Sequence, residues 1–538
     1  MNNTLANIWL FATHWTKLDA FDTEEELNDE LELLQRQSLP TKVRQVTDKE
    51  GREQFLLYVK QADRDYARYC TGWRPGGMMD PPLQKGESMS KQKIQLSDHF
   101  DYSRLIRFVL PCIGTMLFTS IYGIVDGLCV SNFVGKTAFA AVNLIMPVPM
   151  LVGTVGFMLG TGGSAIVGIT LGEGDKARAD RYFSLFMSTA LIAGIVLSVL
   201  GILLLRPVAL MLGAEGEMLD YALRYGRVLM LSLPTFILQN MFQSFFVTAE
   251  KPHLGFYFTV GAGCTNMVLD VLLVGILHWS VEGAAIATML SQVVGGLLPV
   301  FYFLNRKNTS LLHLCRPQFE GGVLLKACVN GSSELMTNLS MSLVNILYNY
   351  QLLRFAGEDG VAAYGVIMYA SFLFVAVFVG YAVGSAPIVS YHYGANNRKE
   401  VNNLYRKSLK LIGVVAVVMT IGSMFIIPHV ARFFVGYDEN LLILTTRAFR
   451  LYGLSFLIMG FNVYASSFFT ALGDGVTSAL ISFLRTLLFQ VAAVLLLPLL
   501  LGIDGIWLAV TAAELAALLV SIGMFITRDQ QFHYRKAE

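Results

Sequence analysis

The sequence predicts an all-α integral membrane protein with twelve transmembrane helices in two six-helix lobes. Composition is the first observation behind this prediction: of the 538 residues, 54% are hydrophobic and 15% are charged, whereas soluble domains carry roughly 25% charged residues. The second observation is a series of long apolar runs that begins at Leu105 and alternates with short polar loops. The third is an internal repeat that divides this series into halves.

Each of the twelve apolar runs has about the 20 residues that a helix needs to cross a bilayer. They cover residues 105–134, 138–171, 182–205, 221–248, 254–278, 282–304, 322–354, 361–392, 405–428, 442–471, 475–501 and 503–527. Basic residues gather in alternate loops, such as Lys176 and Arg178 after the second run and Arg398 after the eighth. Because such loops mark the cytoplasmic side, we expect a multi-pass protein of the cell (inner) membrane with both termini in the cytoplasm.

Residues 1–100 form a polar N-terminal extension that differs from the rest of the chain. We interpret it as dispensable or as not belonging to the natural protein, because the stretch from Met89 reads like a transporter's start and dispensable sequence concentrates at chain ends. The alternative is a small cytoplasmic domain. In that case residues 21–37 would form a short amphipathic helix with Phe21, Leu27, Leu31 and Leu34 on one side.

Two segments of the membrane region resemble each other. GEGDKARADRYFSLF and GANNRKEVNNLYRKSL start 222 residues apart, at Gly172 and Gly394. Six spans separate equivalent positions, so the halves share an orientation and should be related by a pseudo-two-fold axis along the membrane normal, with a cavity between them. We therefore expect an N-lobe at 101–316 (spans 1–6) and a C-lobe at 317–538 (spans 7–12), an architecture typical of a transporter.

Two carboxylates lie inside spans of the first half, Asp126 on span one and Asp270 on span five. A charge near the middle of a transmembrane helix costs roughly 2.5–3.5 kcal/mol and is functional by default. Asn266 precedes Asp270 by one helical turn, on the same face, and Thr288 lies on span six. If the four converge, they offer oxygen ligands to Na⁺ or a carboxyl group to H⁺. The structural alternative is hydrogen bonding between neighbouring helices.

Glu334 lies in a polar stretch of span seven that also contains Asn345 and Asn349. These three residues would line a substrate cavity; equally, they could hold helices together by hydrogen bonds. Pro111 in span one is a candidate hinge, because proline weakens the helical hydrogen-bond ladder. No Walker motif, serine triad or CxxC pair appears, so we expect a secondary active transporter, not an enzyme, with no cofactor and no bound metal except possible Na⁺.

At these positions the chain resembles the MATE (multidrug and toxic compound extrusion) antiporters. The resemblance covers about residues 100 to 530 and rests on VDGLCVSNFVG, MLGTGGSAIVGITLGEGD, TNMVLD, VEGAAIATMLSQ and SSFFTALGDG. It implies a V-shaped, twelve-helix exporter with a cation site at Asp126, Asn266, Asp270 and Thr288. Glu334 matches a carboxylate that some members pair with an acid on span ten, and YGLSFLIMGFNVYASSFF has no such acid.

We expect a multidrug efflux antiporter that exports organic, cationic amphipathic compounds by alternating access, coupled to H⁺ or Na⁺ influx. Its partners would be drug molecules and the lipid bilayer, and we expect a monomer. The net charge of +1 gives no field that would attract nucleic acid.

Two alternatives remain. The first is a lipid-linked precursor flippase of similar two-lobe build, which would need positive charge in its cavity; apart from Arg224, Arg227 and Arg485, the relevant spans carry few basic residues. The second is a non-transporting membrane sensor with residues 1–88 as its output domain.

Overall fold

The computed structural model describes residues 15–21, 41–47 and 53–60, with 27, 28, 31 and 34 between the first two, and then 94–133, 136–305, 307–436 and 438–534. The side chains of residues 15–21, 44–47, 53–55, 60, 124, 126–136 and 139 lie outside this description. The chain divides into two compact units, Met1–Gln92 and Lys93–Glu538. Each is described by itself.

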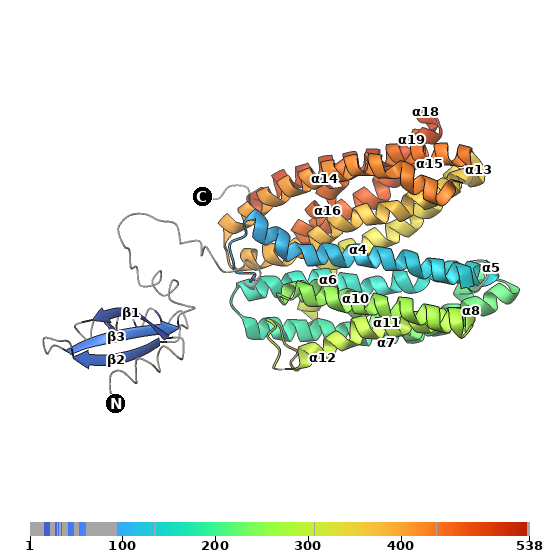
Figure 1. Cartoon of the computed structure of the whole chain (residues 1–538). Coiled ribbons are helices and arrows are strands. Elements are labelled where there is room, and N and C mark those ends of the chain that lie inside the picture. Colours follow the sequence, from blue (N-terminus) through green and yellow to red (C-terminus); the bar gives the residue numbers. More distant parts are fainter. Residues whose placement is uncertain are drawn as a thin grey trace. The chain divides into compact units, whose positions relative to one another are not determined.

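The smaller unit contains a three-stranded antiparallel sheet in the order β1-β3-β2, with β1 at Trp15–Phe21, β2 at Thr41–Thr47 and β3 at Glu53–Lys60 (Figure 1). The sheet was not predicted. Phe21 ends β1 opposite Phe55, so it does not share a helix with Leu27 and Leu34, which are helical and buried. A folded sheet agrees with the alternative that this region is a small domain. That the region is dispensable stays a prediction.

The first half of the membrane unit follows the predicted spans. Its elements are α4 (Tyr102–Phe133), α5 (Lys136–Ile145), α6 (Pro147–Gly172), α7 (Lys176–Met211), α8 (Gly216–Leu231), α9 (Leu233–Thr248), α10 (Pro252–Leu269), the π-helix η2 (Asp270–Ile276), α11 (Ser280–Gln292), the π-helix η3 (Val293–Leu297) and α12 (Leu298–Leu304). Helix α4 packs against both α10 of this half and α13 of the other, and Figure 1 shows it passing between the two groups of helices.

The second half repeats this plan. Its elements are α13 (Gly321–Gly394), α14 (Arg398–Val435), α15 (Glu439–Gly453), α16 (Phe456–Ala471), α17 (Gly475–Phe483), the π-helix η4 (Leu484–Leu488), α18 (Phe489–Leu501), α19 (Ile503–Thr527) and α20 (Asp529–Phe532). Within α13 the backbone at Gly357 is not helical, with φ 63° and ψ −148°. A glycine adopts that conformation without a Cβ clash, so α13 comprises two spans joined at Gly357.

Twelve spans result within the described part of the chain. Nine helices are long and apolar enough to cross a membrane, and the pairs α8–α9 and α15–α16, bent by 55° and 46°, each supply one more. Dividing α13 at Gly357 provides the twelfth. The count and its two six-helix halves agree with the sequence prediction.

The repeat offset of 222 residues reappears in the helix caps. The Asp175 carboxylate accepts a hydrogen bond from the Arg178 backbone N–H at the start of α7. The Asn397 side chain accepts one from the Glu400 backbone N–H at the start of α14. Both residues satisfy amide groups that have no partner in the first helical turn. The halves therefore share local structure as well as sequence.

The two halves meet along α6 and α13, where small residues allow close backbone contact. A Cβ added to Gly331 would collide with the Met158 carbonyl oxygen, and one added to Gly394 would collide with the Ile169 carbonyl oxygen. Since α6 thus touches both spans of α13, these contacts fix how closely the two halves approach each other.

Candidate functional site

The first candidate site lies in the first half, on α10, η2 and α11. Asn266 and Asp270 are 2% and 0% exposed. The Asn266 side-chain amide donates a hydrogen bond to the Thr288 hydroxyl, with 3.4 Å between Nδ2 and Oγ1. The structure therefore brings Asn266 and Thr288 together and places Asp270 one turn along the same helix. The Asp126 side chain lies outside the described residues.

Backbone packing fixes the register between α4 and α10. Gly114 of α4 lies against the Phe256 ring, and Gly263 of α10 lies against the Phe118 ring. The later residue of α4, Phe118, contacts the later residue of α10, Gly263. The two helices therefore run in the same direction. Glycine at each contact allows the helices to approach closely.

This register relates the two predicted carboxylate positions. Asp270 follows Gly263 by seven residues, and Asp126 follows Phe118 by eight. At 1.5 Å per residue, these steps correspond to about 10 and 12 Å along parallel axes. The backbone positions of Asp126 and Asp270 therefore lie at similar heights on helices that pack together.

The α-helix changes to a π-helix at Asp270. Short π-helical stretches inside α-helices are rare and are found frequently at functional sites, because the extra residue re-aims the side chains around it. Three such stretches occur in the described spans, and one of them contains Arg485. No residue pattern in the sequence predicted them.

The second candidate site is a cavity of about 230 Å³, here called the inter-lobe cavity, which is lined mostly by the second half and bordered by two helices of the first. Its walls come from α13, α15, α16, α17, η4, α18 and α19 of the second half and from α6 and α9 of the first. Glu334 and Asn345 line it, as does Tyr348. Among the described residues Asn349 is outside the lining; neighbouring helical positions differ by about 100° in direction, and Tyr348 takes the place facing the cavity.

An ion pair that the sequence analysis missed lies in the wall of this cavity. The Arg485 Nε donates to the Glu514 Oε1 at 2.8 Å, and the two side chains are 12% and 1% exposed. The Asn462 amide donates to the second carboxylate oxygen of Glu514 at 2.7 Å, and Ser521 donates to the Asn462 Oδ1 at 2.9 Å. A buried carboxylate needs such partners to offset its lost hydration.

Glu514 carried a signal that sequence reasoning overlooked. It lies in span twelve within the apolar stretch TAAELAALL, and an acid in a transmembrane helix is a functional candidate. The family resemblance points to a second acid on span ten and not on span twelve. Arg485 was considered only as one of the basic residues that a lipid flippase would need.

Stacked tyrosine rings form one part of the cavity wall, beside valine and methionine side chains. The Tyr348 and Tyr364 rings stack with centroids 5.0 Å apart and planes 5° apart. The Tyr364 hydroxyl donates to the Asn345 Oδ1 at 2.7 Å, which fixes both side chains. A rigid aromatic wall beside carboxylates suits a flat organic cation, through ring contacts and cation–π attraction.

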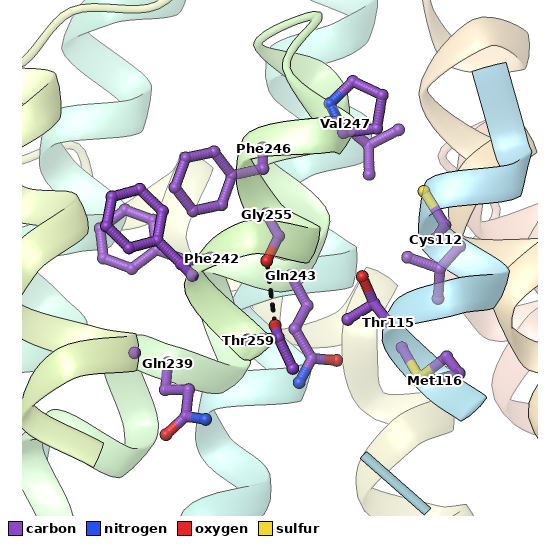
Figure 2. A pocket seen from close by; sticks show the side chains of 14 residues that line it. Cys112, Thr115, Met116, Gln239, Phe242, Gln243, Phe246, Val247, Gly255 and Thr259 are labelled. Atoms are coloured by element: carbon purple, nitrogen blue, oxygen red, sulfur yellow. Dashed lines mark hydrogen bonds between the residues drawn. The ribbon is translucent and has the colours of Figure 1, made fainter. Parts of the chain in front are cut away.

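A smaller pocket adjoins the predicted hinge. It holds about 20 Å³ and is lined by Cys112, Thr115 and Met116 of α4 opposite Gln239 and Gln243 of α9, and Figure 2 shows these side chains around it. Helix α4 continues through Pro111. The Pro111 carbonyl oxygen accepts a hydrogen bond from the Thr115 hydroxyl at 2.9 Å. The hinge at Pro111 stays a prediction.

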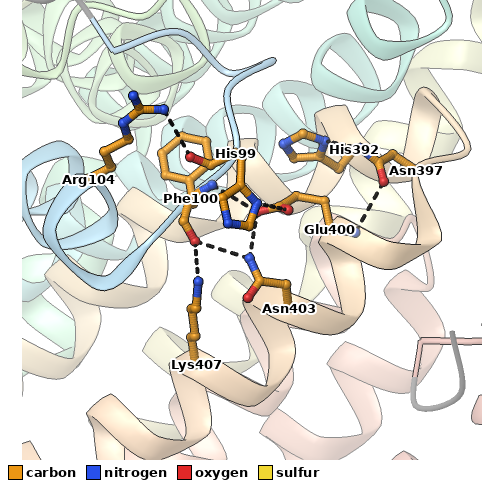
Figure 3. Close-up of polar contacts among 8 residues, drawn as sticks. All are labelled: His99, Phe100, Arg104, His392, Asn397, Glu400, Asn403 and Lys407. Atoms are coloured by element: carbon orange, nitrogen blue, oxygen red, sulfur yellow. Dashed lines mark hydrogen bonds and ion pairs between the residues drawn. The ribbon is translucent and has the colours of Figure 1, made fainter. Parts of the chain in front are cut away.

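Residues 94–101, here called the N-terminal tie, connect the two halves just before α4. The Leu96 backbone N–H donates to the Glu250 carboxylate at 2.7 Å, at the α9–α10 turn. The Phe100 N–H donates to Glu400 of α14 at 2.9 Å, and His99 Nδ1 lies 2.6 Å from the same carboxylate (Figure 3). The predicted extension ended at residue 100; the tie belongs to the membrane unit.

These features define a multi-pass α-helical membrane transporter with two six-helix halves around a cavity. The MatE family model matches residues 111–272 and 335–495, one stretch in each half. The chain belongs to the MATE family, as its sequence motifs suggested.

Its relatives include the Multidrug export protein MepA of Staphylococcus saprophyticus, 23% identical over 432 residues that span 80% of this chain and 94% of the relative. MepA of Staphylococcus aureus MSSA476 is 23% identical over 444 residues, with the same shares covered. A crystal structure of MATE in complex with MaL6 superposes with a TM-score of 0.77 at 24% identity, covering 82% of this chain and 100% of that one. The predicted twelve-helix, two-lobe fold is confirmed.

Proposed function

We propose that this protein is a multidrug efflux antiporter that exports cationic amphipathic compounds across the cell membrane in exchange for H⁺ or Na⁺. The observation that carries the proposal is the inter-lobe cavity, where a carboxylate, Glu334, and an aromatic wall face the same space. Family membership and the MepA relatives, which are named as multidrug export proteins, support the same function.

The coupling cation would bind at Asp270, with Asn266, Thr288 and Asp126 as further oxygen donors. A buried carboxylate surrounded by amide and hydroxyl groups can hold a proton or replace part of the hydration shell of Na⁺. A gradient can drive the cycle only if the inward-open and outward-open states bind that cation with different affinity. Movement of α4, which packs against α10 and α13, would connect cation binding to the cavity.

The orientation follows from the distribution of basic residues. We propose that both termini and the N-terminal tie lie in the cytoplasm, so that the tie closes the cytoplasmic side in the structure described. Labelling of the exposed Cys315, with the other cysteines replaced, in intact cells and in inverted vesicles tests the orientation. Labelling of Cys315 from outside intact cells would contradict it.

The decisive experiment is transport in proteoliposomes with a pH gradient and a Na⁺ gradient imposed separately. Asp270→Asn should reduce gradient-driven export to the level of empty liposomes, because the site loses its charge. The matched control is Asp220→Asn, which changes an acid that is 56% exposed on α8, and it should export normally. Full export by correctly inserted Asp270→Asn protein would exclude this site.

The flippase alternative receives no support from the cavity. Within its described lining, Arg485 is the basic residue, and it already pairs with Glu514. A pyrophosphate group would need unpaired donors or cations to replace its hydration.

A further inference from the structure

We propose that the charge balance of the inter-lobe cavity selects monocations, and that Arg485 is the residue that sets this preference. The proposal rests on the export function proposed above and specifies the charge class of its substrates.

Glu514 is held in place as the permanent partner of Arg485. Its two carboxylate oxygens accept hydrogen bonds from Arg485 and from Asn462, at 2.8 and 2.7 Å. Asn462 also donates to the Glu514 backbone oxygen at 2.8 Å, and Ser521 fixes the Asn462 side chain. With 1% of its side chain exposed, Glu514 is shielded by its own partners from a ligand in the cavity.

Glu334 is in the opposite situation. It lies in the cavity lining, and among the described residues no side chain donates a hydrogen bond to its carboxylate. Arg485 also lines the cavity, but its guanidinium Nε is bonded to Glu514. Glu334 is therefore the carboxylate that a bound cation can reach.

The charges of the lining add to one negative charge. Within the described lining, the formally charged residues are Glu334, Arg485 and Glu514, and the last two cancel. An unbalanced charge in a poorly hydrated cavity is costly. A monocation removes the imbalance, a dication creates one of opposite sign, and an anion increases it. Arg485 thus acts as a built-in cation that occupies the place a second ligand charge would need.

Two variants with different net charge in the cavity test this charge balance. Arg485→Gln leaves two carboxylates in the cavity and should shift the preference toward dications. The double variant Arg485→Gln/Glu514→Gln removes both members of the pair, restores a single negative charge and should regain the monocation preference. It removes Glu514 together with Arg485, so no carboxylate loses an ion-pair partner, which is the main cause of misfolding that threatens the single variant.

Ethidium and propidium are suitable probes, since they share an aromatic ring system and carry one and two permanent positive charges. Binding to the purified full-length protein in nanodiscs is measured by fluorescence. We expect the wild-type protein to favour ethidium by roughly tenfold, Arg485→Gln to lose or reverse this preference, and the double variant to restore it. Glu334→Gln should weaken ethidium binding in each background.

The proposal is overturned if the double variant prefers propidium, or if folded Arg485→Gln keeps the wild-type ratio of affinities. Gradient-driven ethidium export is measured in parallel on the wild-type protein. Absence of export with the expected binding ratios would refute the antiporter function and leave the charge rule intact. Normal export with unchanged ratios in the variants would refute the charge rule alone.

Discussion

Asn462 illustrates how single side chains determine the charge pattern of the cavity. Its amide group donates to both the side chain and the backbone of Glu514 and is itself 0% exposed. Its counterpart in the first half, 222 residues earlier, is Asn240, which instead donates to the Gly153 carbonyl oxygen at 3.4 Å. The same residue type at equivalent positions thus stabilises a carboxylate in one half and a helix contact in the other.

Replacing Asn462 should therefore destabilise the protein. Asn462→Ala leaves one oxygen of a buried carboxylate without its donor, which costs about 1–3 kcal/mol in the free energy of unfolding. Denaturant titration of the detergent-solubilised protein, monitored by tryptophan fluorescence, measures the change. Asn349→Ala, a partly exposed asparagine outside the cavity lining, is the control and should change neither stability nor transport. Equal effects of both substitutions would refute the assigned role.

At the scale of elements, the α6–α13 contact depends on the absence of side chains. Gly331→Ala would place a methyl group against the Met158 carbonyl oxygen, and backbone atoms cannot rotate away. Overpacking of this kind typically costs about 1–3 kcal/mol. We expect a lower thermal unfolding midpoint and reduced export.

Gly322→Ala is the matched control, because the same helix leaves open space around that position, with no atom within 4 Å of an added Cβ. Alanine also has the higher helix propensity, so the unfolding midpoint should stay the same or rise slightly. A midpoint for Gly331→Ala as high as that of Gly322→Ala would show that the helices can separate without penalty.

Elements were predictable to the extent that they depend on length and hydrophobicity. All twelve spans follow from apolar runs long enough to cross a bilayer, and the bounds agree to within several residues. Which side chains of different spans contact each other was harder to predict from the sequence. Hydrophobic periodicity is weak in helices that are apolar on every side, so nothing in the sequence indicated that Arg485 of span eleven faces Glu514 of span twelve. The i,i+4 pair Asn266 and Asp270 was accessible because both lie on one helix.

At the scale of the whole molecule, the smaller unit Met1–Gln92 is separate from the transporter in its contacts. Its sheet was missed because Leu57, Tyr58 and Val59 are all buried, so this strand lacks the alternation of apolar and polar residues that predicts a half-buried strand. The family match begins at residue 111, so this unit lies outside the matched segments.

Deletion of residues 1–88 should therefore leave insertion and export unchanged, because the deletion stops before the N-terminal tie. Export by the truncated and full-length proteins, normalised to the amount in the membrane, is the measurement. Unchanged export would exclude the sensor alternative, and loss of export with normal insertion would show that residues 1–88 are not dispensable.

The N-terminal tie has a mechanical consequence. Its backbone amides are bonded to Glu250 in one half and Glu400 in the other, and its next residues are the first turn of α4. The halves cannot separate at this end unless at least one of these bonds breaks. Because the N-terminal tie continues directly into α4, its release would also allow α4 to move. A nanobody that binds the N-terminal tie and holds it in place would therefore stop the transport cycle without entering the drug pathway.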